Sequence, residues 1–396
     1  HLEIVFYCAI IKSLQGDLFM NTTIIIGAGA SGLLCGHELA KTGENVIILE
    51  QSNKSGRKIL ASGNGRCNLS NTDLQMKYYN TDDWRIAAII NNFDAKKYFE
   101  KIGVLVRQNG KLLYPRSNQS LTVKNALMNN YNNVALIENC EALKITKQGK
   151  GYVVTTTLGD YYGDNIVIAT GSPASLLSGK NNYDLVKQLG LKITKLYPSL
   201  VQLKTKPAYR SLKGVRVKCV AHLYVDKQLI ESQEGEVLFS ENGLSGICIM
   251  QLSRLLPHYQ GIKEISLDLM PDYGQKELAD LLQKRRQDFN DYYLAGIFND
   301  KLAKVLENVA NLKDWRFLIK DTYGIEKAQV ISGGVSLEEV NENLEVNKYP
   351  NIYLTGELLD VDGDCGGYNL HFAFASGYHV AKTIINGKEG LDATNK

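Results

Sequence analysis

The chain has 396 residues, of which 44% are hydrophobic, so it is long enough for two or three domains with a large buried core. Lysine and arginine exceed aspartate and glutamate by only three, which disfavours nucleic acid or an anionic membrane as a partner. Seven cysteines without a CxxC pair argue against a dithiol or zinc centre, and the six histidines lack metal-ligand spacing, so no metal is expected. The composition predicts a cytoplasmic monomer or homodimer with a small-molecule partner.

Residues 1–19 precede the first methionine that is followed by a strand pattern, Met20. Their apolar run from Ile4 to Ile11 is far shorter than the roughly 20 residues that cross a bilayer. The segment also lacks the basic start and the cleavage site of a secretory signal. We therefore interpret residues 1–19 as an N-terminal extension, and expect no membrane anchor.

A β-α-β unit opens the chain after this extension. Residues 22–26 (TTIII) form an apolar run, the loop GAGASG follows at 27–32, and helical periodicity over 30–42 leads to the second run, NVIILE. Glu50 ends that run 18 residues after Gly32. Glycines at this turn let backbone N–H groups approach a pyrophosphate, and the carboxylate can hold ribose hydroxyls, so FAD or NAD is expected rather than NADP.

Two later stretches favour FAD over NAD, because a flavin enzyme must also hold a ring far from the adenosine. The strand in IVIATG (166–171) ends on a Thr-Gly turn that can pass close to a cofactor. In TGELLDVDGDCGGYN (355–369), an acidic glycine loop leads to a helix whose positive end can face the ring and stabilise negative charge on a reduced flavin.

The loop GRKILASGNGRCNLSN (56–71) looks like the path that follows FAD from its pyrophosphate to its ring. Arg57 and Lys58 can offset phosphate charge, and glycines let the backbone pass close to the cofactor. Cys67 has no partner at CxxC spacing, so a contact to the cofactor is favoured over thiol catalysis. A pairing of Cys67 with Cys365 stays open.

The rest of the chain alternates in character. Periodicity over 84–102 predicts one amphipathic helix, and 134–171 reads as several strands. Residues 194–270 are typical of antiparallel β structure, and 275–320 of helices, on which the basic residues 284–286 form a solvated face. After ISGGV at 331, an apolar run typical of a strand is again followed by a helical pattern.

At these motifs the sequence resembles the BaiN and YhiN family of FAD flavoproteins, whose streptococcal-type members are described as aminoacetone oxidases. The resemblance spans about residues 21–385 and rests on the 56–71 loop, GLSGICIMQLSR (243–254), ISGGV (331–335) and GELLDVDGDCGGYNLHFAFASG (356–377). It implies an α/β fold: a Rossmann-like, glutathione-reductase-like FAD-binding domain made of 20–193 and 331–396. A β-rich insert on the substrate side (194–273) and a small helical insert (274–330) interrupt that domain.

The resemblance, together with the fingerprint, implies a set of cofactor-binding residues. They are Gly27, Gly29, Ala30, Ser31, Gly32, Glu50, Gln51, Arg57, Lys58, Ser62, Gly63, Gly65, Arg66, Cys67, Asn68, Ala142, Thr170, Gly171, Gly356, Glu357, Gly367, Asn369 and Leu370. The catalytic residues are not assigned, and the weak candidates are His371, Arg116 and Cys67. His371 stands where the family often has glutamine, and a packed histidine is the favoured interpretation; Arg116 is either a substrate anchor or a surface charge.

No second GxGxxG follows a strand, so the chain lacks a separate nicotinamide domain and dioxygen is the simplest electron acceptor. The expected function is an FAD-dependent oxidase of the amine oxidase type, which acts on the CH–NH2 group of a small amine such as aminoacetone and forms hydrogen peroxide. One alternative is an NAD(P)H-dependent flavin reductase of an enone-type substrate, an activity attributed to bile-acid-processing members of the family. A second is an FAD-dependent modifier or binder of RNA.

Overall fold

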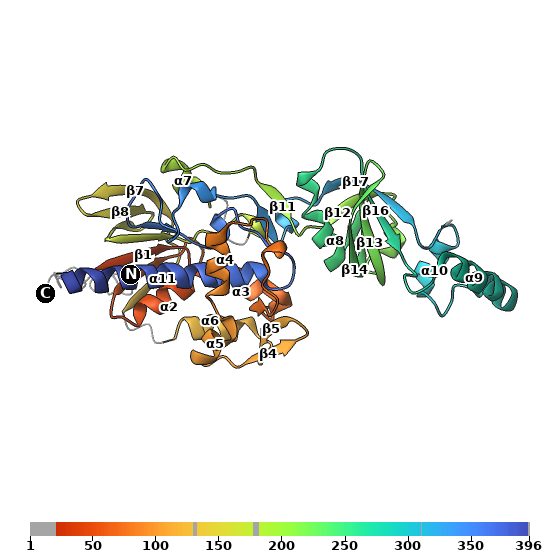
Figure 1. The fold of residues 1–396 in the computed structure, drawn as a ribbon, viewed down its shortest axis with the longest axis horizontal. Helices are drawn as coiled ribbons and strands as arrows, with labels where there is room; N and C mark the ends of the chain where they lie inside the picture. The colour runs from red at the N-terminus through yellow and green to blue at the C-terminus, as the bar shows by residue number, and fades with distance from the viewer. Residues whose placement is uncertain (1–20, 130–132, 177–181, 310, 395–396) are drawn as a thin grey trace. The chain divides into compact units, whose positions relative to one another are not determined.

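The computed structural model describes residues 21–129, 133–176, 182–309 and 311–394. The expected extension at 1–19 therefore lies outside the described residues. The chain divides into two compact units (Figure 1): unit 1 contains the described residues up to Leu196 and from Ser332, and unit 2 is Tyr197–Ile331.

Unit 1 is built on a parallel sheet of five strands in the order β19-β10-β1-β2-β6. Their bounds are β1 Thr22–Ile26, β2 Asn45–Leu49, β6 Val134–Ile137, β10 Asn165–Ile168 and β19 Ile352–Leu354. The central strands are short apolar runs rich in isoleucine and valine, which suits a sheet that is covered on both faces. The register places Ile26 beside both Leu49 and Ile168, so these three strands end together.

Two helices pack against each other in unit 1, α2 (Ala30–Ala40) and α11 (Tyr368–Thr394). Figure 1 shows α11 running beside α2 along the sheet. Their contact is so close that a Cβ atom on Gly377 would lie 2.3 Å from the backbone oxygen of Ser31. The packing of α11 therefore depends on glycine at this position.

The region 84–102 forms two helices, and the prediction of one continuous helix is wrong. They are α4 (Trp84–Asn91) and α5 (Ala95–Lys101). The Asp83 side chain accepts a hydrogen bond from the N–H of Arg85, and the Asp94 side chain accepts one from the N–H of Lys97. Asp94 therefore caps a new helix within the periodic pattern, since an aspartate at this position satisfies an N–H group of the first turn.

Smaller elements surround this sheet. They are α3 (Arg57–Ala61), the three-stranded sheet β3 (Ser70–Asn71), β5 (Leu112–Pro115) and β4 (Val106–Asn109), α6 (Ser120–Leu127), the antiparallel sheet β7 (Ala142–Gln148), β8 (Gly151–Thr156) and β9 (Gly159–Gly163), and α7 (Asp184–Gln188). One hydrophobic core extends through unit 1, from β1 and α2 to α11. The unit is thus an α/β, Rossmann-like domain assembled from both ends of the chain.

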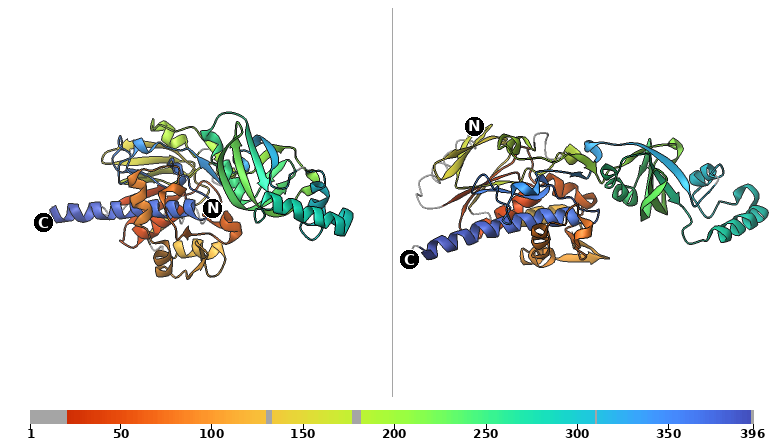
Figure 2. Two further views of the ribbon diagram at one scale, coloured as in Figure 1. Left: turned by 45° about the vertical axis from the view of Figure 1, so that its right-hand side comes forward. Right: turned by 45° about the horizontal axis from the view of Figure 1, so that its top comes forward.

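Unit 2 contains a closed barrel, which Figure 2 shows from two further directions. Its strands are, in barrel order, β12 (Leu203–Lys206), β15 (Gly243–Ser245), β14 (Gln228–Ser240), β13 (Arg216–Val225), β16 (Lys263–Asp268) and β17 (Trp315–Thr322). The prediction of helix up to residue 320 is wrong at its end, because the buried side chains of Trp315 and Phe317 alternate along β17. That alternation is the period of a strand.

The helices of unit 2 are α8 (Ile247–Ser253), α9 (Gln275–Phe289) and α10 (Asp300–Leu306). Leu278 of α9 and Leu302 of α10 belong to the same hydrophobic core as the barrel residue Phe317. The β-rich and helical segments therefore form one unit with a shared core.

The strand β11 (Tyr197–Ser199) pairs with β18 (Val330–Ser332) where the chain enters and leaves this unit. Among the described residues, no helix is long and apolar enough to cross a membrane.

Two glycines of α11 test the packing of this helix. Gly377→Ala should destabilise the protein by about 1 to 3 kcal/mol, because its Cβ would meet the backbone oxygen of Ser31 at 2.3 Å. Gly387→Ala, in the same helix but with no atom within 4 Å of its Cβ, should be neutral or stabilise, since alanine favours helix. Urea denaturation measures both variants. Equal stability of the two would contradict the packing described.

Candidate functional site

The predicted cofactor residues gather where the parallel strands of unit 1 end. The glycine loop follows β1, Glu50 follows β2, Thr170 and Gly171 follow β10, and Gly356 and Glu357 follow β19. Ligands of open α/β sheets bind at this carboxyl edge. Segments that are far apart in the sequence thus meet at one place, which we call the carboxyl edge below.

The three fingerprint glycines have different surroundings. A Cβ on Gly27 would lie 2.4 Å from the oxygen of Ala169, and one on Gly32 would lie 2.0 Å from the oxygen of Gly27, so both positions are closed by protein. A Cβ on Gly29, in contrast, would have no protein atom within 4 Å. Open space beside Gly29 is what a phosphate group needs in order to reach the backbone.

The N-terminus of α2 lies at this open space. Gly29 is its N-cap residue and provides no side-chain cap, and the first turn, which includes Ala30 and Ser31, has no acidic residue. The free N–H groups and the positive end of the helix dipole are therefore available to an anion. These features fit the pyrophosphate of a dinucleotide.

Glu50 is fixed next to the fingerprint loop. One carboxylate oxygen accepts a hydrogen bond of 2.9 Å from the N–H of Ala28, and the other accepts one of 2.9 Å from the N–H of Ser52 and one from the Ser52 hydroxyl. Gln51 follows it directly. The backbone oxygen of Glu50 accepts a bond from Cys140, which leads to Ala142 at the start of β7. The predicted ribose-binding acid is thus held in place by the backbone.

Lys58 joins three segments of the carboxyl edge. Its Nζ atom forms an ion pair of 2.7 Å with Glu357 and a hydrogen bond of 2.8 Å with the backbone oxygen of Ser172. Glu357 neutralises the Lys58 charge, so the expectation that Lys58 offsets phosphate charge does not fit this arrangement. Arg57 makes no ion pair within the described ranges, and the N–H of its neighbour Gly56 bonds to Ala28 of the fingerprint loop at 2.8 Å. Arg57 is therefore the better candidate for a phosphate.

The following loop contains four more of the predicted residues. The Ser62 hydroxyl donates to the oxygen of Ile59 at 2.7 Å, and Gly63 adopts φ +55°. A Cβ on Gly65 would meet no atom within 4 Å. Arg66 is exposed, and its guanidinium lies 5.4 Å from the centre of the Tyr114 ring.

Cys67 is fully buried, and burial raises the pKa of its thiol to about 12. Its thiol is therefore neutral at physiological pH, whereas thiol catalysis requires a thiolate. No disulfide joins Cys67 to Cys365. This geometry suits a packing residue or a cofactor contact, not a redox centre.

The loop before α11 is held by amide side chains. With its amide oriented to match its neighbours, Asn68 accepts a hydrogen bond of 3.1 Å from the N–H of Gly367. Asn369 accepts one of 2.8 Å from the N–H of Gly363, and Leu370 lies half-buried beside it. The loop 56–71 is thus tied to Gly367, directly before α11; that this loop follows the cofactor stays a prediction.

His371 lies inside the core. It is fully buried, its Nε2 donates to the oxygen of Ile90 at 3.0 Å, and its Nδ1 accepts from the Ser70 hydroxyl at 2.7 Å. This tautomer follows because a carbonyl oxygen can only accept. Burial lowers the pKa of His371 to about 4, so the ring is neutral at physiological pH. Both ring nitrogens are occupied by hydrogen bonds within the core, so His371 does not suit the role of a catalytic base.

Arg116 is exposed at the end of β5, and its backbone N–H bonds to the oxygen of Leu105 at 2.8 Å. Its position suits a surface charge.

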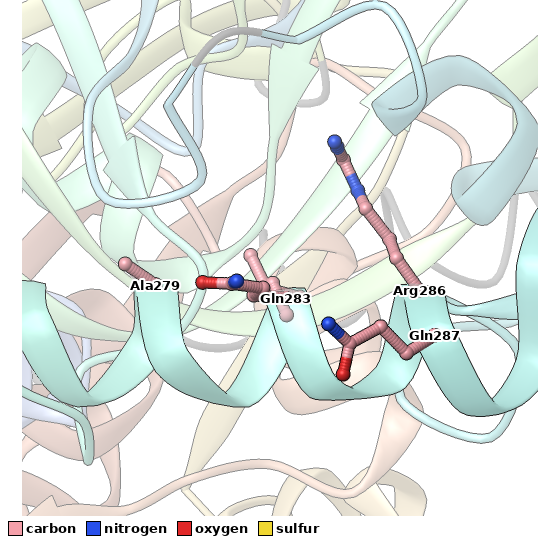
Figure 3. A pocket seen from close by; sticks show the side chains of 5 residues that line it. Ala279, Gln283, Arg286 and Gln287 are labelled. Carbon is pink, nitrogen blue, oxygen red and sulfur yellow. The ribbon is translucent and has the colours of Figure 1, made fainter.

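A shallow hollow of about 460 Å³ lies on α9 of unit 2 (Figure 3), lined by Ala279, Leu282, Gln283, Arg286 and Gln287. None of the predicted site residues lines it. Across the described ranges, no group of His, Cys, Asp and Glu could hold a metal ion.

A profile of the HI0933-like protein Rossmann domain matches residues 21–383. The chain belongs to the HI0933-like family. The cofactor of this family is FAD, and the glycine cradle, the N-terminus of α2 and the carboxylate of Glu50 fit the pyrophosphate and ribose of this dinucleotide. The protein is an FAD-dependent oxidoreductase of α/β, Rossmann-like fold.

Three characterised relatives align over nearly their whole length. A 3-dehydro-bile acid delta(4,6)-reductase of Clostridium scindens is 32% identical over 91% of this chain and 98% of the relative. Ribosomal RNA dihydrouridine synthases are 28% identical in Escherichia coli and 26% identical in Haemophilus influenzae, each over 92% of this chain and 98% of the relative.

Sequence reasoning missed the contacts that hold the site together. Lys58 and Glu357 are 299 positions apart, and Ser172 had no role in the predicted set. The sequence signals the pairing of Lys58 with Glu357 only by a basic residue after the fingerprint and an acidic residue after β19.

Gly29→Ala should separate cofactor binding from folding. Because its Cβ meets no protein atom and φ is −84°, the apoprotein should keep its melting temperature, while the affinity for FAD should fall at least tenfold. Flavin fluorescence titration measures the affinity. Gly32→Ala is the control variant: it should lower the melting temperature of the apoprotein, because its Cβ would lie 2.0 Å from the oxygen of Gly27. Unchanged FAD affinity in Gly29→Ala would contradict this site.

His371 should make stability pH-dependent. Its pKa is 6.5 in the unfolded chain and about 4 in the fold, so below pH 6.5 only the unfolded chain takes up the proton. Stability is then lost as the pH falls from 6.5 to 4, by about 3 kcal/mol at most. Urea denaturation at pH 7 and 4.5 should show a smaller loss in His371→Gln, which keeps both hydrogen bonds without titrating. An equal loss in the two proteins would refute this.

Proposed function

We propose that this protein is an FAD-dependent reductase that adds two hydrogens across a carbon–carbon double bond conjugated to a carbonyl group in a small molecule. The observation that carries the proposal is the alignment with the bile acid reductase, at 32% identity over 98% of that relative. The chain covers the whole length that such a reductase uses. The proposal selects the enone-type alternative from the sequence analysis.

The names of the two kinds of relatives describe related chemistry. A delta(4,6)-reductase acts on double bonds conjugated to the 3-oxo group of a steroid, and a dihydrouridine synthase saturates a bond of uracil that is conjugated to a ring carbonyl. Reduction of such a conjugated bond in general adds hydride to the carbon remote from the carbonyl and a proton to the carbon next to it. This shared reaction supports a conjugated acceptor for the present chain.

The residues at the carboxyl edge have defined tasks in such an enzyme. Gly29 and the N-terminus of α2 would bind the pyrophosphate, Glu50 the ribose, and Arg57 a phosphate oxygen. The Lys58–Glu357 pair fixes the loops after β10 and β19 relative to α3. FAD supplies the two-electron chemistry when it is bound.

A small substrate is favoured over RNA by the near-neutral charge of the chain, which is +3 in total. A cytoplasmic location, the absence of nucleic-acid and membrane partners, and a monomer or homodimer stay predictions.

The amine oxidase hypothesis, with aminoacetone, dioxygen and hydrogen peroxide, also stays a prediction. It requires a base that keeps the amine neutral. None of its candidates suits that task, because His371 and Cys67 are buried and Arg116 is exposed. The reductase is therefore proposed in its place, on the alignment with the bile acid reductase.

Anaerobic flavin spectroscopy tests the proposal. Photoreduced enzyme should regain its yellow absorption on mixing with a 3-oxo-4,6-diene bile acid, because the double bond accepts the two electrons. Unmodified ribosomal RNA should leave the reduced spectrum unchanged, and aminoacetone should not bleach the oxidised enzyme. Bleaching by aminoacetone with peroxide release in air would favour the oxidase, and reoxidation by RNA alone would favour the dihydrouridine synthase.

A further inference from the structure

Tyr183 has a buried hydroxyl group without a hydrogen-bond partner. The residue follows the loop after β10 and is 5% exposed, and its Oη atom has no hydrogen-bond partner among the residues that the structure describes. Buried hydroxyl groups are nearly always paired, since an unpaired one costs about 1 to 3 kcal/mol. A hydroxyl left unpaired by the protein is therefore available to a ligand.

Two hydrogen bonds of the preceding residue place Tyr183 at the carboxyl edge. Its neighbour Asn182 donates to the backbone oxygen of Thr170 at 2.6 Å, and the Thr170 hydroxyl donates to the oxygen of Asn182 at 2.8 Å. Thr170 is one of the predicted cofactor residues. These two bonds fix the backbone before Tyr183 to the end of β10.

A second buried hydroxyl group at the carboxyl edge is also unpaired among the described residues. Thr355 is fully buried, and its Oγ1 atom has no hydrogen-bond partner in the described part of the chain. Its N–H bonds to the oxygen of Ile168 at 3.1 Å, so it lies where β19 and β10 end together. Thr355 opens the stretch 355–369 that is expected to face the flavin, and Tyr183 follows the other such stretch, 166–171, to which Asn182 is bonded. Both hydroxyls are therefore available to form hydrogen bonds with a bound group at this edge.

The phenol of Tyr183 is kept protonated. Burial raises its pKa first, and the nearby carboxylates of Glu357 and Asp360 raise it further, because both disfavour a phenolate. The group is consequently a proton donor across the physiological pH range. A tyrosine can act as a general acid when the accepting atom becomes strongly basic in the reaction.

On the basis of the proposed function, we propose that the Tyr183 hydroxyl donates the proton that completes the reduction of the conjugated substrate. The substrate carbon remote from the carbonyl receives hydride from the FAD-dependent half of the reaction, which supplies both electrons. The resulting enolate takes the proton at the carbon next to the carbonyl, as the Tyr183 O–H bond breaks and a C–H bond forms. Solvent then returns a proton to Oη.

Tyr183→Phe tests this role, with Tyr152→Phe as the matched control. Tyr152 is also buried in unit 1, but its hydroxyl donates to the oxygen of Pro350 at 2.8 Å, so it is a paired tyrosine with a structural task. Because Tyr183 Oη has no partner, Tyr183→Phe should not lower the melting temperature, whereas Tyr152→Phe loses a hydrogen bond.

Photoreduced enzymes are mixed anaerobically with 2-cyclohexen-1-one and with a 3-oxo-4,6-diene bile acid. Tyr183→Phe should be reoxidised about 100-fold or more slowly than the wild type, with FAD affinity within about twofold of it. Tyr152→Phe should be reoxidised at about the wild-type rate. In D2O, the wild type should place deuterium on one face of the carbon next to the carbonyl, and Tyr183→Phe should lose that selectivity.

The outcomes separate this inference from the proposed function. Reoxidation of Tyr183→Phe at the wild-type rate would overturn the inference alone. A loss of FAD affinity in Tyr183→Phe would also overturn it, and would make Tyr183 a cofactor ligand. Failure of both substrates to reoxidise the wild type would overturn the proposed function and this inference together.

Discussion

In unit 1, the parallel pairing of β1 with β2 and β10 makes three separate parts of the chain turn at the same edge. Ile26 lies beside both Leu49 and Ile168, so the fingerprint loop, Glu50 and the loop after β10 must share one small volume. The available space is so limited that Gly27 and Gly32 have no room for a Cβ atom. Gly29 is left as the position where a ligand can approach the backbone.

Electrostatics then holds the more distant segments at this edge. The ion pair of Lys58 with Glu357 connects the short helix α3 to the loop after β19, and the bond to Ser172 adds the loop after β10. Arg57 makes no ion pair among the described residues, so we propose it as the phosphate-binding residue. One basic residue thus assembles the site while its neighbour stays available to bind, a division that residue type alone could not reveal.

Much of unit 1 could be predicted from local patterns. The strand at 22–26 and the helix start after Gly367 were recognisable, because apolar runs and glycine turns depend on near neighbours. The break between α4 and α5 was missed because the periodicity continues across the Asp94 cap. The strand β17 was missed because only its barrel partners show which side chains point inward.

The site was less predictable than the fold. The open space at Gly29, the unpaired hydroxyl of Tyr183 and the packing of His371 depend on contacts between remote segments, which no spacing in the sequence encodes. The family resemblance supplied the set of cofactor residues, and the structure divides that set by task. His371 belongs to the supporting core, Cys67 is buried and suits packing or a cofactor contact, and Gly29 and Glu50 lie at the edge where a dinucleotide is expected to bind.

The central claim is that FAD binds along the carboxyl edge of unit 1. Hydrogen–deuterium exchange of the apoprotein, with and without FAD, measures this directly. The account predicts protection in peptides that contain residues 27–32, 56–68, 169–172 and 355–370, with no change in the barrel strands of unit 2. Protection confined to the barrel, or to the hollow on α9, would contradict it.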